Sequence, residues 1–399
     1  MKSCSIKSPY SLLKGTYTVQ QLSLFLKSPL RHALSGTLIL AIAFGFGRFA
    51  YTAIYPHMMQ DHLISLQQGG YIASANYLGY LIGALLSVRI KQHNASLYTL
   101  IATVGSSLGL LLLGFVDNIW AIIAIRLIAG ALSAFAMVAA SIWLLQNLQL
   151  KNYAPLLYAG VGSGIALSSG LIILGETLNL SSQSLWLFIG ISTLVLASFA
   201  IPSLLSHNQV SPSHSSSALN TPTLSAKRLI IAYGLTGFGY IMTATYLPTL
   251  VKRALPELGS TELWALFGLM AAPSCWVWHK CHLKLGHQNA LILNLLVQGI
   301  GVILPVVLPN SLGYLCSAAL TGGTFMGTVT LVISAAQQHQ KPNLIALLTL
   351  FYSIGQILGP LAANILFGIT NTLNSALIIA GLALIIAAAS CLKQSQEIL

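Results

Sequence analysis

The chain has 399 residues, of which 56% are hydrophobic and only 6% are charged, against roughly 45–50% and about 25% in soluble globular proteins. This composition excludes a soluble protein. The absence of a low-complexity repeat, together with a mean hydropathy of +0.81, excludes a disordered or fibrous chain. A net charge of +12 would suggest a nucleic-acid partner in a soluble protein. In so apolar a chain we expect the lipid bilayer as the environment and no nucleic acid.

Long apolar runs are the strongest signal in the sequence. A helix that crosses a membrane needs roughly 20 apolar residues, and twelve such runs are nearly free of charge. They are continuously apolar, which favours helices over barrel strands, because those alternate over about 10 residues. The predicted fold class is therefore an all-α membrane protein with twelve transmembrane helices. The runs cover residues 34–56, 67–89, 95–115, 119–145, 153–175, 184–205, 229–251, 262–279, 288–308, 311–335, 343–369 and 373–392.

The positions of the charges predict an orientation. Of the 18 Lys and Arg residues, most lie in the two tails and in alternate loops, which places both termini in the cytoplasm by the positive-inside rule. Five of the acids fall on the opposite side: Asp61, Asp117, Glu176, Glu257 and Glu262. All six tryptophans fall near run ends, which predicts two interfacial aromatic belts.

The chain also shows signs of duplication. A segment rich in Ser, Pro and His separates the sixth and seventh runs and is typical of a flexible linker. The segment Gly45-Phe46-Gly47, followed by Pro56, recurs at one offset as Gly237-Phe238-Gly239, followed by Pro248. We therefore predict two parallel repeats. The expected parts are a basic cytoplasmic tail (1–33), an N-terminal bundle (34–205), a linker (206–228), a C-terminal bundle (229–392) and a cytoplasmic tail (393–399).

Several glycine-rich motifs are specific in combination. They are Gly45-Phe46-Gly47-Arg48-Phe49-Ala50-Tyr51-Thr52 and the segments 73–80, 160–168, 232–240, 322–327 and 355–360. With these motifs the sequence from 34 to 392 resembles the major facilitator superfamily (MFS), and closely its bacterial YbfB/YjiJ-type branch. The resemblance implies two six-helix bundles in the bacterial inner membrane. They would surround a central cavity, lined mainly by spans 1, 4, 7 and 10, that opens alternately to each side.

Two arginines inside spans are the sharpest candidates for function. An arginine near the middle of a span costs about 2.5–3.5 kcal/mol on insertion scales, so it should face a partner or water. We predict that Arg48 and Arg126 form a cationic layer that binds the acidic group of an anionic substrate. The alternative is structural pairing with backbone carbonyls or with an acid at the rim. The residues expected to add hydrogen bonds to the substrate are Tyr51, Asn76 and Tyr240. Gln356 is a further candidate for the cavity lining, with a hydrogen bond to a neighbouring helix as the equal alternative.

A coupling site is harder to place. No Asp or Glu lies deep in any run, although proton-coupled carriers commonly need a carboxylate in the transport path. The nearest candidates for a coupling proton are Glu176 and Asp117, with a solvated acid at the rim as the alternative interpretation.

Signals for other chemistry are weak. The segment Gly105–Gly109 fits the G-x-S-x-G pattern of hydrolases, but that pattern needs a strand–turn–helix context. His279, Cys281, His282 and His287 are residue types that bind zinc, yet no second ligand group accompanies them. We expect no enzyme activity, no metal and no cofactor. The predicted function is secondary transport of a small organic solute by a monomer, with an organic anion favoured. The alternative is a membrane sensor or scaffold that keeps the fold without transporting.

Overall fold

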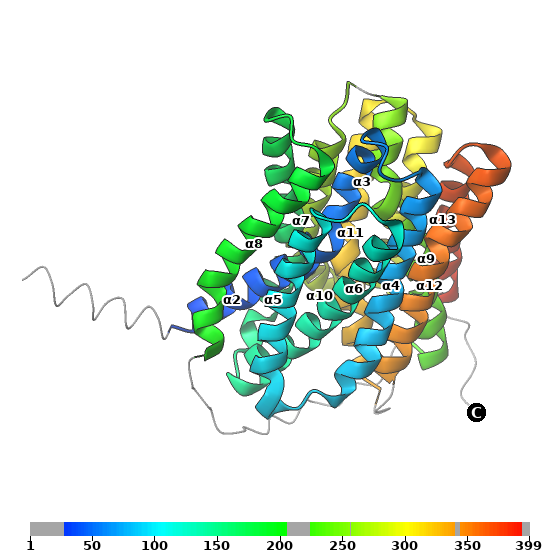
Figure 1. The fold of residues 1–399 in the computed structure, drawn as a ribbon. Helices are drawn as coiled ribbons and strands as arrows, with labels where there is room; N and C mark the ends of the chain where they lie inside the picture. The colour runs from blue at the N-terminus through cyan, green and yellow to red at the C-terminus, as the bar shows by residue number, and fades with distance from the viewer. Residues whose placement is uncertain (1–27, 206–223, 256, 340–343, 393–399) are drawn as a thin grey trace, which may run out of the picture.

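The computed structural model describes residues 28–205, 224–255, 257–339 and 344–392, and within these ranges the regular structure is helical. The long helices lie side by side in one bundle (Figure 1). The N-terminal half contains α2 (Pro29–Leu40), the π-helical segment η1 (Ala41–Phe49), α3 (Ala50–Gln60), α4 (Leu66–Leu86), α5 (Ala95–Leu113), α6 (Ile119–Ser141), α7 (Ala154–Thr177) and α8 (Ser182–Leu205). The C-terminal half contains α9 (Ala226–Ala254), α10 (Ser260–Val307), α11 (Ser311–Gln337), α12 (Leu344–Thr370) and α13 (Asn374–Ser390).

The predicted tails and linker fall mostly on residues that the structure leaves undescribed, namely 1–27, 206–223 and 393–399. The first helix begins at Pro29, before the predicted run at residue 34. Pro29 stands at the first helical position and the Ser28 hydroxyl accepts a hydrogen bond from the Arg31 amide. Both features are typical of a helix N-terminus.

Ten described helical segments are long and apolar enough to cross a membrane, judged by length and composition. One of them, α10, has 48 residues and would extend about 72 Å as one helix, more than twice the thickness of a bilayer core. Gly286 interrupts it with a φ of 78°. Phe267, before Gly286, and Gly301, after it, both pack on the turn of α11 around Gly322. The two parts of α10 therefore lie side by side, and the chain reverses at Gly286. With α10 counted as two passes and the shorter α13 added, each of the twelve predicted runs has its helix.

The two halves use equivalent close contacts between helices. A Cβ atom built on Gly45 would lie 2.1 Å from the Gly164 backbone, and one built on Gly237 would lie 2.2 Å from the Tyr352 carbonyl oxygen. Gly130 meets the Asn76 carbonyl oxygen in the same way that Gly322 meets that of Phe267. Span 1 thus packs on span 5 as span 7 packs on span 11, which is what an internal duplication requires. Small residues let helix backbones approach closely. In a membrane this close packing matters, because the hydrophobic effect contributes little to the association of helices.

The predicted tryptophan belts are wrong for most of the six residues. Only Trp120 and Trp276 are exposed, at 74% and 38%. The others are buried between helices, where the indole N–H groups of Trp264 and Trp278 donate to backbone carbonyl oxygens. The buried tryptophans are Trp143, Trp186, Trp264 and Trp278.

Gly164→Ala should destabilise the protein, since the new methyl group would collide with the Ala41 backbone, 2.5 Å from the built Cβ. We expect a loss of about 1–3 kcal/mol, typical of overpacking. Thermal unfolding of the purified protein in detergent measures it. Gly170→Ala on the same helix is the control, because its Cβ meets nothing within 4 Å. Equal melting temperatures for the two variants would contradict the packing role.

Candidate functional site

A central cavity of about 670 Å³ lies between the two halves. We call the face formed by residues 87–94 and 147–153 the inner face, following the predicted orientation, and the opposite face the outer face. The cavity reaches the inner face, since its lining includes Val88, which is 75% exposed. Tyr80 and Tyr233 contribute to its wall from opposite halves, and no lining residue is charged. The cavity therefore suits a mainly apolar solute that enters from the inner face.

Arg48 lies directly behind Tyr80. Its guanidinium carbon is 4.2 Å from the centre of the Tyr80 ring and 5.1 Å from that of Tyr77. One terminal nitrogen donates to Gln356 Oε1 at 2.8 Å, and Nε has no hydrogen-bond partner. The side chain is only 3% exposed. Over the described ranges the structure has a single ion pair, His57–Glu176, so no described carboxylate pairs with the Arg48 guanidinium.

The helix that carries Arg48 widens into π-helical turns from Ala41 to Phe49, a distortion that is frequent at functional sites. Such turns leave carbonyl oxygens that need partners from other helices. Arg126 donates from its two terminal nitrogens to the carbonyl oxygens of Gly47, at 2.6 Å, and Arg48, at 2.7 Å. Trp264 donates to the Phe49 carbonyl oxygen at 3.1 Å. Side chains from α6 and α10 thus hold the widened segment in place.

Tyr240 and Gln356 join Arg48 in one polar group. The Gln356 amide nitrogen donates to the Tyr240 hydroxyl, while its oxygen accepts from Arg48. This contact crosses between the halves, from η1 to α9 and α12. The Tyr240 ring stacks on Phe325, with centres 4.8 Å apart, and lies parallel to Tyr352 at 5.8 Å. Three of the predicted site residues are therefore brought together.

The other predicted residues lie nearby but face different partners. Asn76 donates to the Arg126 carbonyl oxygen at 2.8 Å, and its own Oδ1 has no hydrogen-bond partner. The Tyr51 hydroxyl donates to the Gly69 carbonyl oxygen at 2.9 Å, and its ring lies 4.9 Å from the Arg126 guanidinium carbon. Both residues are buried.

On the outer side of Arg48 the halves are tied together. Thr52 donates to the Ala244 carbonyl oxygen at 2.8 Å, and the hydroxyls of Tyr77 and Thr245 lie 3.0 Å apart. Asn364 donates to the Gln67 carbonyl oxygen at 3.0 Å. The structure is therefore closed on the outer side and open on the inner side.

Comparison with known proteins agrees with this architecture. Residues 40–392 match a family described as uncharacterised MFS-type transporter YbfB. The chain belongs to the YbfB family. It is thus an MFS-type transporter, a multi-pass membrane protein with a small-molecule substrate, and not an enzyme. The G-x-S-x-G segment lies inside the continuous helix α5 and so lacks the strand–turn–helix context of a hydrolase.

Solved structures share the fold of this YbfB-family chain. The nucleoside transporter NupG matches at a TM-score of 0.68 and 13% identity, covering 91% of this chain and 98% of its own. A point mutant of NupG gives the same TM-score at 14% identity, with 90% and 98% covered. At such identities the likeness concerns the fold alone. No curated protein matches the sequence.

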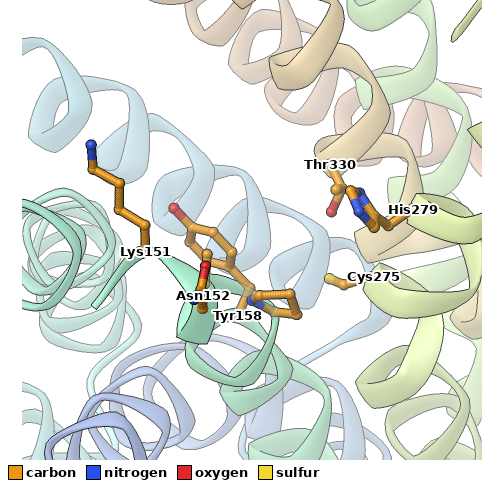
Figure 2. A pocket seen from close by; sticks show the side chains of 8 residues that line it. Lys151, Asn152, Tyr158, Cys275, His279 and Thr330 are labelled. Atoms are coloured by element: carbon orange, nitrogen blue, oxygen red, sulfur yellow. The ribbon is translucent and has the colours of Figure 1, made fainter. Parts of the chain in front are cut away.

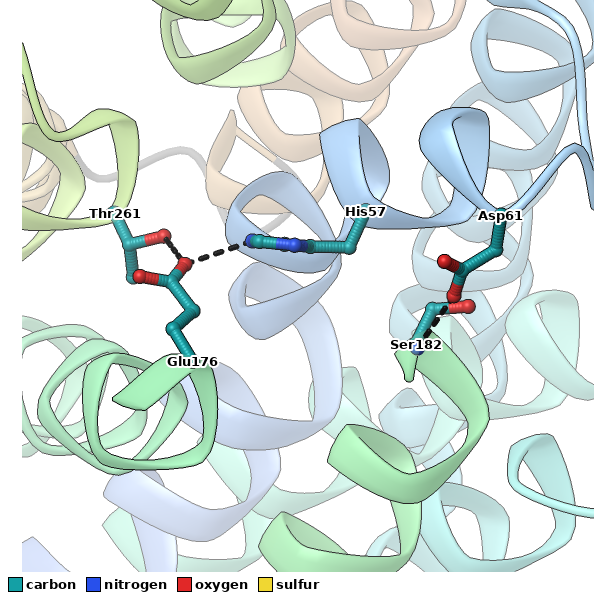
Figure 3. A network of polar contacts seen from close by, with 5 residues as sticks. All are labelled: His57, Asp61, Glu176, Ser182 and Thr261. Atoms are coloured by element: carbon teal, nitrogen blue, oxygen red, sulfur yellow. Dashed lines mark hydrogen bonds and ion pairs between the residues drawn. The ribbon is translucent and has the colours of Figure 1, made fainter. Parts of the chain in front are cut away.

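A polar network on the outer face joins the two halves of the YbfB-family fold (Figure 3). Glu176 Oε1 lies 2.7 Å from His57 Nε2 and accepts a hydrogen bond from the Thr261 hydroxyl. His57 and Glu176 belong to the N-terminal half, whereas Thr261 lies on α10. Beside it, Asp61 accepts from the Ser182 amide at 2.6 Å, within the N-terminal half. The other predicted coupling candidate, Asp117, is exposed.

Sequence reasoning missed the residues that line the path to Arg48. Tyr80 and Tyr233 fall within the glycine-rich segments 73–80 and 232–240, but nothing in those segments marks either tyrosine as a lining residue. A second pocket of about 440 Å³ shares Tyr158 and Thr330 with the central cavity. Figure 2 shows Tyr158 with Lys151 and Asn152 on one side of it, and Thr330 with Cys275 and His279 on the other. This second pocket therefore adds a charged side chain, Lys151, and a titratable one, His279, which the central cavity lacks.

Glu176→Ala should favour opening on the outer side, because it removes the contact with Thr261. The carboxylate is 28% exposed, so we expect a shift of about 1 kcal/mol, or severalfold in population. Double electron–electron resonance between spin labels at the exposed positions 115 and 312 measures the distance between the two halves.

Thr177→Ala is the control for this measurement, since the Thr177 hydroxyl bonds only to Leu174 of its own helix. A distance distribution in Glu176→Ala identical to that of the control would exclude a gating role for Glu176.

Proposed function

We propose that this protein transports a small organic anion across the bacterial inner membrane by alternating access. The observation that carries the proposal is Arg48. It is a buried guanidinium against Tyr80, a residue of the cavity wall, and it is hydrogen-bonded to a neutral amide with its Nε group unpartnered. An anionic substrate supplies the counter-charge that the protein itself does not.

Desolvation makes the burial of the Arg48 guanidinium costly. Burying an ion costs several kcal/mol even after relaxation, and this cost is offset only by opposite charge or by several hydrogen bonds. Aromatic rings within about 6 Å contribute roughly 0.5–2 kcal/mol each through cation–π attraction. Four rings surround Arg48: those of Phe44, Phe49, Tyr77 and Tyr80. They keep the guanidinium in place, while a carboxylate or phosphate oxygen would bind it more strongly.

We assign different roles to the two arginines. Both terminal nitrogens of Arg126 are engaged by the carbonyl oxygens of the widened helix, so we propose that it positions the backbone of Arg48. Asn76, bonded to the Arg126 carbonyl oxygen, and Tyr51, beside its guanidinium, support the same position. Contact with the substrate then falls to Arg48, Gln356 and Tyr240.

Alternating access follows from where the contacts between the halves lie. A substrate bound at Arg48 leaves to the outer side only if the bonds Thr52–Ala244 and Glu176–Thr261 break. We propose Glu176 rather than Asp117 as the group that links a coupling proton to this opening. A protonated carboxyl would lose the charge that strengthens its bonds to His57 and Thr261.

Arg48→Gln should reduce transport at least tenfold, because the variant loses charge-assisted hydrogen bonds worth about 1.5–3 kcal/mol. A comparison of metabolites in cells with and without the protein identifies the solute. Flux into proteoliposomes then measures the effect, and repeating it with the proton gradient collapsed tests coupling.

Arg89→Gln is the control, because Arg89 is exposed on the inner face. The organic-anion proposal would be overturned by an Arg48→Gln variant that transports at the wild-type rate. Absence of any flux in the wild type would favour a sensor or scaffold.

A further inference from the structure

We infer that the substrate is an aromatic acid, whose planar ring binds between Tyr80 and Tyr233 while its acidic group reaches Arg48. This inference rests on the proposed function and names its substrate class. It depends on a separate observation, the arrangement of the aromatic rings that border the cavity near Arg48.

Each of the two tyrosines has one side covered and borders the cavity with the rest of its ring. Tyr80, on α4, carries the Arg48 guanidinium 4.2 Å from its ring centre. Tyr233, on α9, stacks on Tyr352 with centres 4.2 Å apart and planes at 17°. Both rings line the same cavity from opposite halves. They therefore border the space open to a solute from two directions.

The ring of Tyr233 is the end of a longer stack. Tyr352 lies parallel to Tyr240 at 11°, and Tyr240 is stacked on Phe325 at 18°. Neighbours on both sides thus fix the plane of each inner ring. A preorganised stack loses little entropy when one more ring is added to its end. This favours a flat aromatic solute over a flexible chain of equal volume.

The remaining residues of the cavity lining suit a solute that carries one charged group on an apolar body. Met137 and Met326 border the cavity, and thioethers contact aromatic rings favourably. Because no lining residue is charged, a solute with a second charged group would leave that group unpaired. The described part of the chain offers Arg48, behind Tyr80, as the cation nearest to the two rings. A single acidic group next to a ring matches this geometry.

Three probes separate the aromatic requirement from the charge requirement. They are 2-naphthoate, its saturated decalin carboxylate of equal charge, and the neutral 2-naphthamide. Equilibrium binding to the full-length protein in lipid nanodiscs gives two affinity ratios. Because offset stacking adds about 0.5–1.5 kcal/mol beyond buried area, naphthoate should bind about two- to tenfold tighter than the decalin acid.

Substitutions of the two tyrosines test whether their rings cause the preference for naphthoate. Tyr80→Leu and Tyr233→Leu should bring the naphthoate-to-decalin ratio close to one, whereas Tyr80→Phe and Tyr233→Phe should keep it. Tyr71→Leu is the matched control, since Tyr71 lies on the same helix as Tyr80 and is 51% exposed. It should leave both affinities unchanged.

The outcomes distinguish the two proposals. A naphthoate-to-decalin ratio near one in the wild type, a ratio that survives both Leu variants, or no saturable binding of naphthoate overturns the aromatic inference. A naphthoate-to-naphthamide ratio near one overturns the organic-anion proposal, and leaves only the aromatic part of the inference. The two failures therefore cannot be confused.

Discussion

The site depends on the hydrogen bonds from Arg126 to the carbonyl oxygens of Gly47 and Arg48. The widened turns of η1 expose carbonyls inside the protein, where an unpaired polar group costs several kcal/mol. One guanidinium satisfies two of them and is itself stabilised by them. Because the bonds hold the two peptide groups that flank the Arg48 Cα atom, they also fix the direction in which the Arg48 side chain leaves the helix.

Two buried cations thus have different environments for a physical reason. Each terminal nitrogen of Arg126 donates to a backbone carbonyl oxygen, which suits a structural role. Arg48 has one amide oxygen and four aromatic rings, which hold a cation without neutralising it. Gln356 bridges Arg48 to Tyr240, and so links the charge to the C-terminal half. An anion bound at this point, as proposed, would contact groups of both halves, as alternating access requires.

Much of the fold could be predicted from the sequence, because twelve apolar runs and the duplicated glycines are local signals. Arg48, Tyr240 and Gln356 could be chosen because polar groups are costly in a span. The pairing of Arg126 with carbonyls was an open alternative, since the sequence does not show that η1 is π-helical. The roles of Tyr80 and Tyr233 could not be predicted either, because an aromatic residue in a span packs equally well against lipid, helix or cavity. Burial of Trp186 and Trp264 was missed for the same reason.

The most direct test of the account is an experimental structure of the inward-open protein with its transported solute bound. We expect the acidic group of the solute within hydrogen-bond distance of the Arg48 guanidinium, with Arg126 still bonded to the Gly47 and Arg48 carbonyls. A solute whose acidic group contacts another residue, while Arg48 stays enclosed behind Tyr80, would contradict it.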